Sequence, residues 1–253
     1  MEQVLVRASR VYEVIIGEGV LSELGLRAAA LLRGRRAVIV TDSNVGPLYA
    51  RRTEETLRDA GFAVTTFTFP AGEASKNPRT LLELLTFFAK QELTREDVVI
   101  ALGGGVTGDL AGLAASLYLR GVPCIQVPTS LLAMVDSSVG GKTAVDLPEG
   151  KNLVGTFTQP YLVLCDITTL DTLPKEVFEE GMAEVIKYGM IRSKELLELL
   201  LTDDAERKRE RVIAQCVRLK RDVVAEDEQD FGERQILNFG HTLGHAIERE
   251  MNY

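Results

Sequence analysis

The stretch that decides the fold is "VVIALGGGVTGDLAGLAAS", residues 98–116. An apolar run of strand length leads into a glycine turn, and the alanine-rich segment after the turn is typical of a helix. Gly103, Gly105 and Gly108 have G-x-G-x-x-G spacing, which lets main-chain N–H groups and a helix N-terminus approach a pyrophosphate. The strand–turn–helix context favours this interpretation over a simple tight turn. The stretch therefore predicts a dinucleotide site at the end of a buried strand.

The first two thirds of the chain repeat this alternation of strand and helix. Apolar runs of strand length lie at 37–40, 63–69, 124–127 and 162–165, helical periodicity at 45–60 and 78–91, and a weak edge-hairpin alternation at 3–16. Such alternation predicts a mostly parallel sheet with helices on both faces. After Thr172 the strands vanish, and 175–201, 203–226 and 240–250 all read as helices. We therefore expect an α/β nucleotide-binding domain over 1–172, closely packed against a helical domain over 173–253.

A carboxylate and an amide end the first of these strands, in "VIVTDSN". Asp42 and Asn44 are suited to holding ribose hydroxyls. In a Rossmann fingerprint the acidic residue follows the glycines, whereas here it precedes them by about 60 residues. The glycine turn is therefore a dinucleotide candidate on a different topology.

Composition narrows the possible partners and location. The net charge of −8 and the absence of a clustered basic run argue against nucleic acid. No apolar run is long enough for a membrane span, and the opening "MEQVLVRASR" lacks the apolar core of a signal peptide, so we expect a cytoplasmic protein with no membrane partner. Three widely spaced cysteines fit neither a disulfide framework nor a CxxC metal site.

Basic residues gather in "DSSVGGKTAVDLPEGKN". Lys142 and Lys151 stand on what reads as a glycine- and proline-broken loop, with Asp136 before them and Asn152 after. The small, apolar surroundings favour a binding loop over two solvated lysines. The Gly-Lys-Thr within it is not a phosphate-binding P-loop, because Asp136 occupies the position that needs glycine.

Two helical segments carry the remaining candidates. In "EEGMAEVIKYGMI", Glu184, Lys187 and Tyr188 share one helix face, which fits a structural ion pair and a functional site about equally. The only two histidines of the chain, His241 and His245, form an HxxxH pair one helical turn apart. Such a pair alone is more often a buried polar pair than a metal site, and without HExxH a metalloprotease has no support.

Taken together, six motifs in order resemble the 3-dehydroquinate synthase family of sugar-phosphate cyclases. They are "PAGEASKN", "GGGVTGDLAG", "PTSLLAMVDSSVGGKTAVDLPEGKNLVGTF", "DTLP", "EEGMAEVIKYGMI" and "RQILNFGHTLGHAIE". The resemblance runs from about Asp42 to the end of the chain. It implies a nucleotide-binding α/β domain followed by a helical metal- and substrate-binding domain, in a homodimer.

The resemblance also implies three sets of site residues. NAD would be held by Asp42, Asn44, Gly72, Glu73, Lys76, Gly104, Gly105, Asp109, Thr129, Ser130, Lys142, Lys151, Thr169, Leu170, Asp171 and Thr172. The substrate would be contacted by Asp136, Lys142, Asn152, Lys187, Lys220, Arg234, Asn238 and His245, and by Arg120 from the neighbouring subunit. A divalent metal, zinc or cobalt, would take Glu184 and His241, so that Glu184 is a ligand and not the ion-pair partner of Lys187.

The implied reaction belongs to the shikimate pathway of aromatic amino-acid biosynthesis. The substrate, 3-deoxy-D-arabino-heptulosonate 7-phosphate, is anionic at both ends, which explains the lysines and arginine in an acidic protein. Transient oxidation by NAD, β-elimination of phosphate, return of the hydride and an intramolecular aldol closure give 3-dehydroquinate.

The chain departs from the family pattern in one respect. Family members carry a further "HGEAV"-type motif whose histidine is the third metal ligand, and this sequence has none, so we expect an incomplete helical domain and weak metal binding. Two alternatives stay open: another cyclase, such as a 2-deoxy-scyllo-inosose synthase, and a non-catalytic NAD-binding dimer subunit. A metal-dependent polyol dehydrogenase is disfavoured by the lysine-rich loop.

Overall fold

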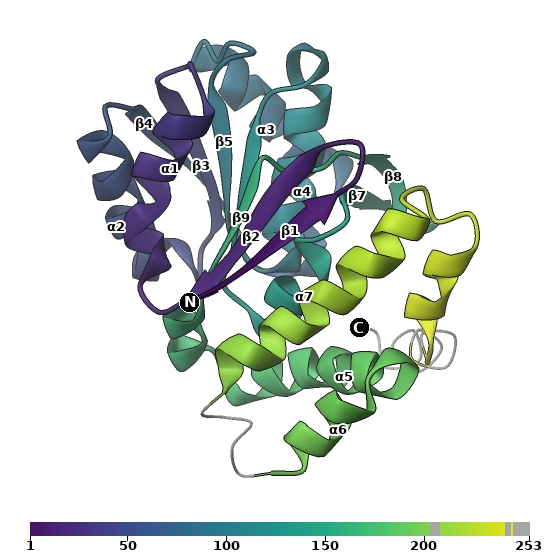
Figure 1. The fold of residues 1–253 in the computed structure, drawn as a ribbon. Helices are drawn as coiled ribbons and strands as arrows, with labels where there is room; N and C mark the ends of the chain where they lie inside the picture. The colour runs from purple at the N-terminus through teal and green to yellow at the C-terminus, as the bar shows by residue number, and fades with distance from the viewer. Residues whose placement is uncertain (203–207, 241–243, 245–253) are drawn as a thin grey trace.

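A seven-stranded sheet forms the centre of the molecule in a computed structural model that describes residues 1–202, 208–240 and 244 (Figure 1). Its strands are β1 (Glu2–Arg7), β2 (Val11–Gly17), β3 (Arg36–Asp42), β4 (Ala63–Phe69), β5 (Val98–Gly103), β6 (Cys124–Pro128) and β9 (Leu162–Asp166). Their order is β1-β2-β9-β6-β5-β3-β4, with β1 antiparallel to β2 and all other neighbours parallel. The predicted parallel α/β fold and its edge hairpin are thus confirmed.

Helices cover both faces of this sheet. The short turn η1 (Val20–Glu23), α1 (Leu24–Leu31) and α2 (Gly46–Asp59) lie on one face, and α3 (Pro78–Lys90) and α4 (Gly105–Leu117) lie on the other. Neighbouring residues of β3 show the division, since Ile39 packs with Leu24 and Leu57 while Val38 packs with Leu84 and Leu110. A strand buried on both faces reads as a continuous apolar run, which is why residues 37–40 and 98–102 were recognisable in the sequence.

The last third of the described chain is helical and packs on the edge hairpin. It contains α5 (Lys175–Arg192), α6 (Lys194–Leu200), α7 (Arg209–Glu226) and the 3-10 turn η6 (Glu233–Asn238). Val14 of β2 shares one hydrophobic cluster with Val185, Leu196 and Val217 of the three helices, and α7 runs along β1 and β2 (Figure 1). Because this core is shared, the boundary expected after residue 172 stays a prediction.

Two helix predictions need correction. The helix expected over 175–201 is interrupted at Ser193, whose main chain is extended and whose hydroxyl accepts the N–H of Leu196, 3.2 Å away, to begin α6. The helix expected from residue 203 begins at Arg209, and residues 203–207 lie outside the described ones. The helix expected over 240–250 also lies outside them, apart from Gly240 and Gly244.

The lysine-bearing loop is in fact a hairpin. Strands β7 (Lys142–Leu147) and β8 (Gly150–Phe157) pair antiparallel as a separate two-stranded sheet, with an irregularity between Val145 and Leu147. A Cβ at Gly155 would lie 2.3 Å from the carbonyl oxygen of Thr143, so this glycine permits close approach of the two strands. The glycines that suggested a loop lie at the ends of these strands, since Gly140 and Gly141, both with positive φ, precede β7 and Gly150 begins β8.

Candidate functional site

The glycine turn joins β5 to α4 at the edge where the parallel strands end. Thr129, at the end of β6, donates its main-chain N–H to the carbonyl of Gly103 at 3.0 Å. A Cβ on Gly104 would meet only the hydroxyl of Ser130, at 3.5 Å, and the 13-residue α4 begins at the next residue. The open side of this turn and the N–H groups of the helix fit a pyrophosphate.

Asp42 organises the neighbouring turn at the same edge. Its Oδ1 accepts the main-chain N–H groups of Asn44 and Val45 at 2.8 and 3.0 Å. The Thr107 hydroxyl of α4 donates to its Oδ2 at 3.4 Å. The carboxylate therefore stands between the starts of α2 and α4, and the structure brings the predicted pair Asp42 and Asn44 to the glycine turn.

Lys76 connects the expected cofactor residues to the hairpin. It follows the short turn η2 (Glu73–Ser75), is 6% exposed, and places its Nζ 2.6 Å from both Oδ2 of Asp109 and Oδ1 of Asn152. Burial raises the pKa of Asp109 to about 6, although the charge of Lys76 opposes the shift. A residue predicted to contact substrate, Asn152, thus shares one lysine with a residue predicted to contact NAD.

Asp136 lies in a π-helical turn, η4 (Ala133–Ser137), and receives donors from two helices. The ammonium of Lys220 on α7 lies 2.9 Å from its Oδ1 and 2.7 Å from its main-chain oxygen, and the Tyr188 hydroxyl of α5 donates to Oδ1 at 2.5 Å. Burial opposes ionisation of Asp136, but the charges of Lys220 and Lys187 and the two hydrogen bonds outweigh it and hold its pKa well below the usual range. Burial also lowers the pKa of Lys220, against the charge of Asp136.

Glu184 and Lys187 form an ion pair on α5, and their side chains are 15% and 7% exposed. Glu184 is thus the ion-pair partner of Lys187 here, and its expected role as a metal ligand stays a prediction. The other expected metal ligand, His241, lies outside the described residues, as does His245. Within residues 1–202, 208–240 and 244, no three His, Cys, Asp or Glu side chains gather closely enough to hold a metal ion.

Arg234 is held by the turn that follows α7. The Asp227 carboxylate accepts the main-chain N–H groups of Phe231, Gly232 and Arg234, at 2.7 to 3.2 Å. The guanidinium is 2% exposed; its Nη1 donates to the carbonyl oxygen of Glu228 at 2.7 Å, while its buried Nε has no hydrogen-bond partner among the described residues. A buried cation with spare donor capacity is suited to an anionic ligand.

A cavity of about 670 Å³ unites candidates from several separate segments. The predicted residues that line it are Asp109, Asp136, Lys142, Asn152, Lys220 and Asn238. Ser137, Gln229 and Asp230 also line it, and Asp230 forms an ion pair with Lys142 that the sequence did not reveal. Asp230 follows α7 in an ordinary acidic surface stretch, so no local pattern marked it.

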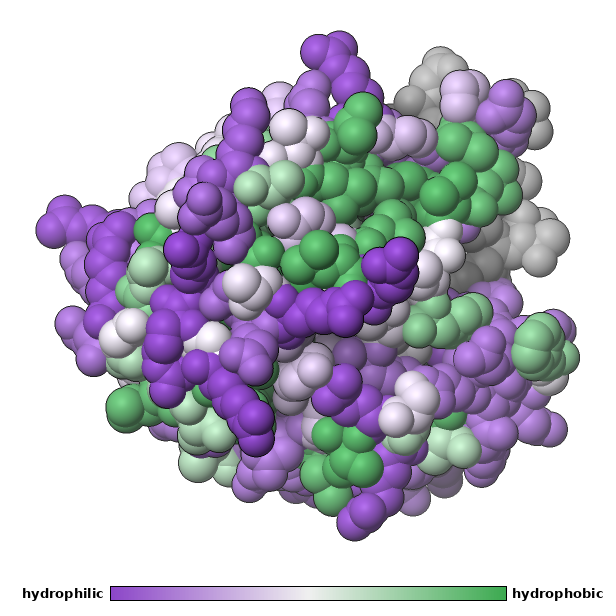
Figure 2. All heavy atoms as spheres, turned by 90° about the horizontal axis from the view of Figure 1, so that it is seen from above, coloured by the Kyte–Doolittle hydropathy of each residue, from purple (hydrophilic) through white to green (hydrophobic). Residues whose placement is uncertain are grey.

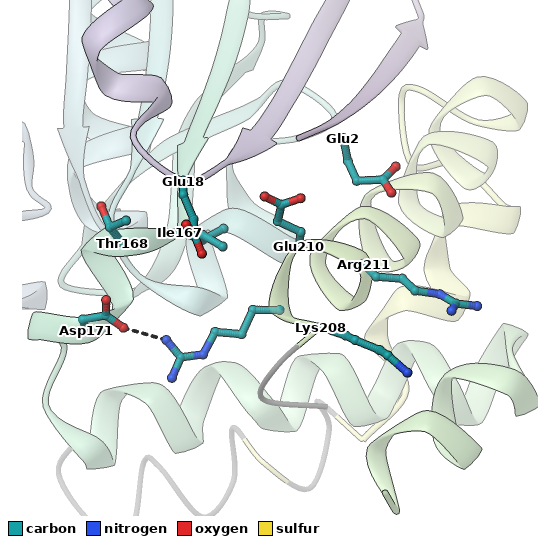
Figure 3. Close-up of a pocket in the computed structure, with 9 residues that line it drawn as sticks. Glu2, Glu18, Ile167, Thr168, Asp171, Lys208, Glu210 and Arg211 are labelled. Atoms are coloured by element: carbon teal, nitrogen blue, oxygen red, sulfur yellow. Dashed lines mark hydrogen bonds and ion pairs between the residues drawn. The ribbon is translucent and has the colours of Figure 1, made fainter. Parts of the chain in front are cut away.

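Other predicted residues lie away from this cavity. Thr169 and Leu170 of η5 (Ile167–Thr172) are buried, and the Tyr49 hydroxyl lies 2.5 Å from Oγ1 of Thr172. Asp171 pairs with Arg209 and lines a separate hollow of about 470 Å³, whose walls carry both acidic and basic side chains (Figure 3). Apart from Asp171, no candidate residue lines that hollow, so it is not the expected site.

Arg120 lines a third hollow, of about 360 Å³, beside Arg10 and Tyr161. It follows α4 in a turn where both Leu119 and Arg120 have positive φ, 50° and 66°. Such backbone is uncommon outside glycine and asparagine. Arg120 is not among the residues that line the 670 Å³ cavity of its own chain.

Two protein-family models match the chain from residue 66 onward, and Asp42 and Asn44 lie before the matched region. Residues 66–180 match the model described as 3-dehydroquinate synthase N-terminal, and residues 181–253 match the one described as 3-dehydroquinate synthase C-terminal. The 3-dehydroquinate synthase of Streptococcus mutans is 50% identical over 247 residues, and that of Symbiobacterium thermophilum is 49% identical over 251. Each alignment covers 96% of this chain and 70% of the relative.

Solved structures agree in fold. A 2-deoxy-scyllo-inosose synthase complexed with carbaglucose-6-phosphate, NAD+ and Co2+ superposes with a TM-score of 0.89 at 30% identity, covering 98% of this chain and 71% of that one. A 2-epi-5-epi-valiolone synthase from Streptomyces hygroscopicus with NAD+ and Zn2+ bound gives 0.82 at 29% identity, covering 95% and 68%. An iron-containing alcohol dehydrogenase, at 16% identity and a TM-score of 0.68, shares the fold alone.

Proposed function

Because this chain belongs to the 3-dehydroquinate synthase family, we propose that its 670 Å³ cavity is where 3-deoxy-D-arabino-heptulosonate 7-phosphate is converted to 3-dehydroquinate and phosphate. The family activity is that of a lyase of the shikimate pathway, and the substrate is a small anionic sugar phosphate. The single observation that carries the assignment of the site is that six expected residues from separate segments line one cavity.

Although Asp109, Asp136 and Asp230 also line the cavity, the cations in and around it offer sites for an anionic substrate. Lys142 and Lys220 line it, and Arg234 lies against Gly140, where a Cβ would approach its Nη2 to 2.6 Å. Lys142 is half-exposed and paired with Asp230, so it can exchange that partner for a substrate oxygen at little cost. We propose that these cations bind the carboxylate and phosphate ends, while Asp136 and Asn152 orient the ring hydroxyls.

NAD fits the edge formed by the glycine turn and Asp42. The open side of Gly104 and the start of α4 would receive the pyrophosphate, and the amide of Asn44, which is exposed, would meet a ribose. Asp109 lines the cavity and follows the glycine turn on α4, and Lys76 joins it to Asn152, which suits residues that contact the nicotinamide end.

A divalent metal would be held by the Glu184 carboxylate together with His241, a donor set that suits zinc or cobalt. When bound, NAD supplies a reversible hydride acceptor and the metal a Lewis acid. Lys187, already paired with Glu184, would orient that carboxylate and contact the substrate from the same helix face.

A homodimer is proposed from exposed apolar surface and from the position of Arg120. Leu117 at the end of α4, Leu119 in the turn after it, and Leu153 and Phe157 on β8 are each at least 40% exposed, and the last two also line the proposed substrate cavity. Figure 2 shows hydrophobic side chains gathered on the upper face of the molecule among hydrophilic ones. A second copy covering such surface would bring Arg120 toward the cavity of its neighbour.

The cytoplasmic location is proposed on the sequence alone. None of the described helices is both long and apolar enough to cross a membrane.

A comparison of two substrates tests the proposed function. The protein, with NAD and zinc, is offered the heptulosonate phosphate and, separately, glucose 6-phosphate, and release of inorganic phosphate is followed. Release from the former alone supports the proposal. Release from glucose 6-phosphate alone would assign the chain to the 2-deoxy-scyllo-inosose type, and NAD binding without release from either would support a non-catalytic subunit.

A further inference from the structure

Tyr188 does not line the cavity, but its buried hydroxyl binds Asp136, which does, and packing alone does not require that hydroxyl. The residue lies on α5, is 0% exposed and belongs to the hydrophobic cluster shared by the helices and the edge hairpin. A phenylalanine would fill the same space. A buried hydroxyl needs a partner, and this one finds it in the Asp136 carboxylate, 2.5 Å away, rather than in a main-chain carbonyl.

The hydrogen bond from Tyr188 determines which carboxylate oxygen of Asp136 is held by the protein and which is left for a ligand. Oδ1 accepts both the Tyr188 hydroxyl and the Lys220 ammonium, and these are the hydrogen bonds that described residues make to this carboxylate. Since Asp136 also lines the cavity, its Oδ2 keeps acceptor capacity for a substrate hydroxyl. Because the Tyr188 hydroxyl is neutral, it holds Oδ1 in place without adding a charge beside Lys187 and Lys220.

The same arrangement orients Lys220. Two of its three N–H donors are used by Asp136, at Oδ1 and at the main-chain oxygen, which leaves the third for the cavity that Lys220 lines. On the other side, the ammonium of Lys187 lies 5.3 Å from the centre of the Tyr188 ring. The Tyr188 side chain therefore binds Asp136 through its hydroxyl and lies within cation–π distance of Lys187 through its ring.

We propose that Tyr188 is a positioning residue, which locks the Asp136 carboxylate and through it aims Lys220 at the substrate. The expected effect on catalysis rests on the proposed function. The effect of Tyr188 on Asp136 and Lys220 can be tested without turnover. This role falls to a residue that contacts neither substrate nor cofactor in the proposed site.

Tyr188→Phe, compared with Tyr12→Phe, tests the proposal. Tyr12 is a matched control because it is also buried and its hydroxyl accepts the N–H of Gly140, 3.1 Å away, four residues beyond Asp136. The rate of chemical acylation of Lys220, measured by mass spectrometry in native buffer, is expected to rise about tenfold in Tyr188→Phe and to stay within about twofold in Tyr12→Phe. Equal rates in the wild type and Tyr188→Phe, or equal increases in both variants, would overturn the proposal.

Kinetics give a second readout that a purely structural role would not move. Tyr188→Phe should lower kcat/KM for the heptulosonate phosphate about tenfold and leave NAD affinity unchanged, and Tyr188→4-aminophenylalanine, which keeps a donor, should restore it. Unchanged kcat/KM, or no rescue, would contradict the proposal. If the wild type releases no phosphate, the proposed function fails while the acylation rates still decide the role of Tyr188.

If Tyr188→Phe does not fold, the proposal is tested on protein that keeps a tyrosine analogue at position 188. With 3-fluorotyrosine in place of tyrosine, the fluorine resonance of position 188 should move when Lys220 is replaced by methionine, because Asp136 joins the two residues, whereas that of position 12 should not. A resonance at position 188 that stays in place would overturn the proposal.

Discussion

Lys220 and Asp136 are 84 residues apart in the sequence, yet the Lys220 ammonium lies 2.7 Å from the main-chain oxygen of Asp136 and 2.9 Å from its Oδ1. This pair joins α7 to the π-helical turn after β6, and both residues line the proposed substrate cavity. The helical part of the chain therefore completes a site whose other walls come from α4, η4 and the hairpin of β7 and β8.

Lys220→Met should destabilise the protein and weaken substrate binding. It leaves Asp136 partly buried without its nearest cation, and breaking such a pair costs about 3 kcal/mol. Urea unfolding should show this loss, and the double variant Asp136→Asn, Lys220→Met should recover part of it. A loss in the double variant equal to the sum of the two single losses would mean that the pair is not coupled.

Gly104→Ala should separate cofactor binding from stability. Its Cβ would be in ordinary contact with Ser130, so the free energy of unfolding should change by less than about 1 kcal/mol. The methyl group would enter the space proposed for the pyrophosphate, so NAD affinity measured by calorimetry should fall about tenfold or more. The contrasting variant is Gly112→Ala, deeper in α4, whose Cβ would lie 2.5 Å from Cγ2 of the buried, β-branched Thr143 and should lower stability. Unchanged NAD affinity in Gly104→Ala would place the pyrophosphate elsewhere.

Asp109→Asn should change how stability depends on pH. The pKa of Asp109 rises from 3.8 to about 6 on folding, so the native state binds the proton more tightly than the unfolded state does. Protonated Asp109 therefore stabilises the folded state fully below about pH 4, and this stabilisation is lost as the pH rises through 6. The wild type should lose up to about 3 kcal/mol relative to Asp109→Asn over this interval.

Urea unfolding at several pH values between 4 and 7.5 measures this difference. The exposed Asp59→Asn, on α2, serves as the control. A stability difference between the wild type and Asp109→Asn that does not vary with pH would show that Asp109 is ionised as easily in the native state as in the unfolded chain.

Glu184→Gln should weaken metal binding and also destabilise the fold. The first effect follows from loss of a proposed ligand, and the second from leaving buried Lys187 without its countercharge. Zinc titration and urea unfolding measure the two effects separately. Glu180→Gln, an exposed change on the same helix, should alter neither. Wild-type zinc affinity in Glu184→Gln would remove Glu184 from the ligand set.

Local patterns predicted the central fold well. The strand, turn and helix at 98–116 are contiguous in the sequence, and fully buried parallel strands produce apolar runs that need no knowledge of the rest of the chain. The break at Ser193 was missed because the apolar periodicity continues across it, and one side-chain cap decides it. The hairpin of β7 and β8 was missed because the residues that flank and join its strands, Gly140, Gly141, Pro148 and Gly150, look like loop residues.

The contacts within the site could not be read from local patterns. Lys76 meets Asp109 and Asn152 from three separate elements, and Lys142 meets Asp230, 88 residues later. Such partners are set by packing of whole elements and not by spacing. The resemblance to a family supplied the identities of many candidates, whereas the structure supplied their pairing.

Phosphate release from 3-deoxy-D-arabino-heptulosonate 7-phosphate, with NAD and zinc present, tests the central claim most directly when the wild type is compared with Asp136→Asn. The account predicts that the wild type forms phosphate and 3-dehydroquinate in equal amounts, and that Asp136→Asn lowers kcat/KM at least about a hundredfold because the cavity loses a substrate-orienting carboxylate. Equal turnover by the two proteins would contradict the assignment of the reaction to this cavity.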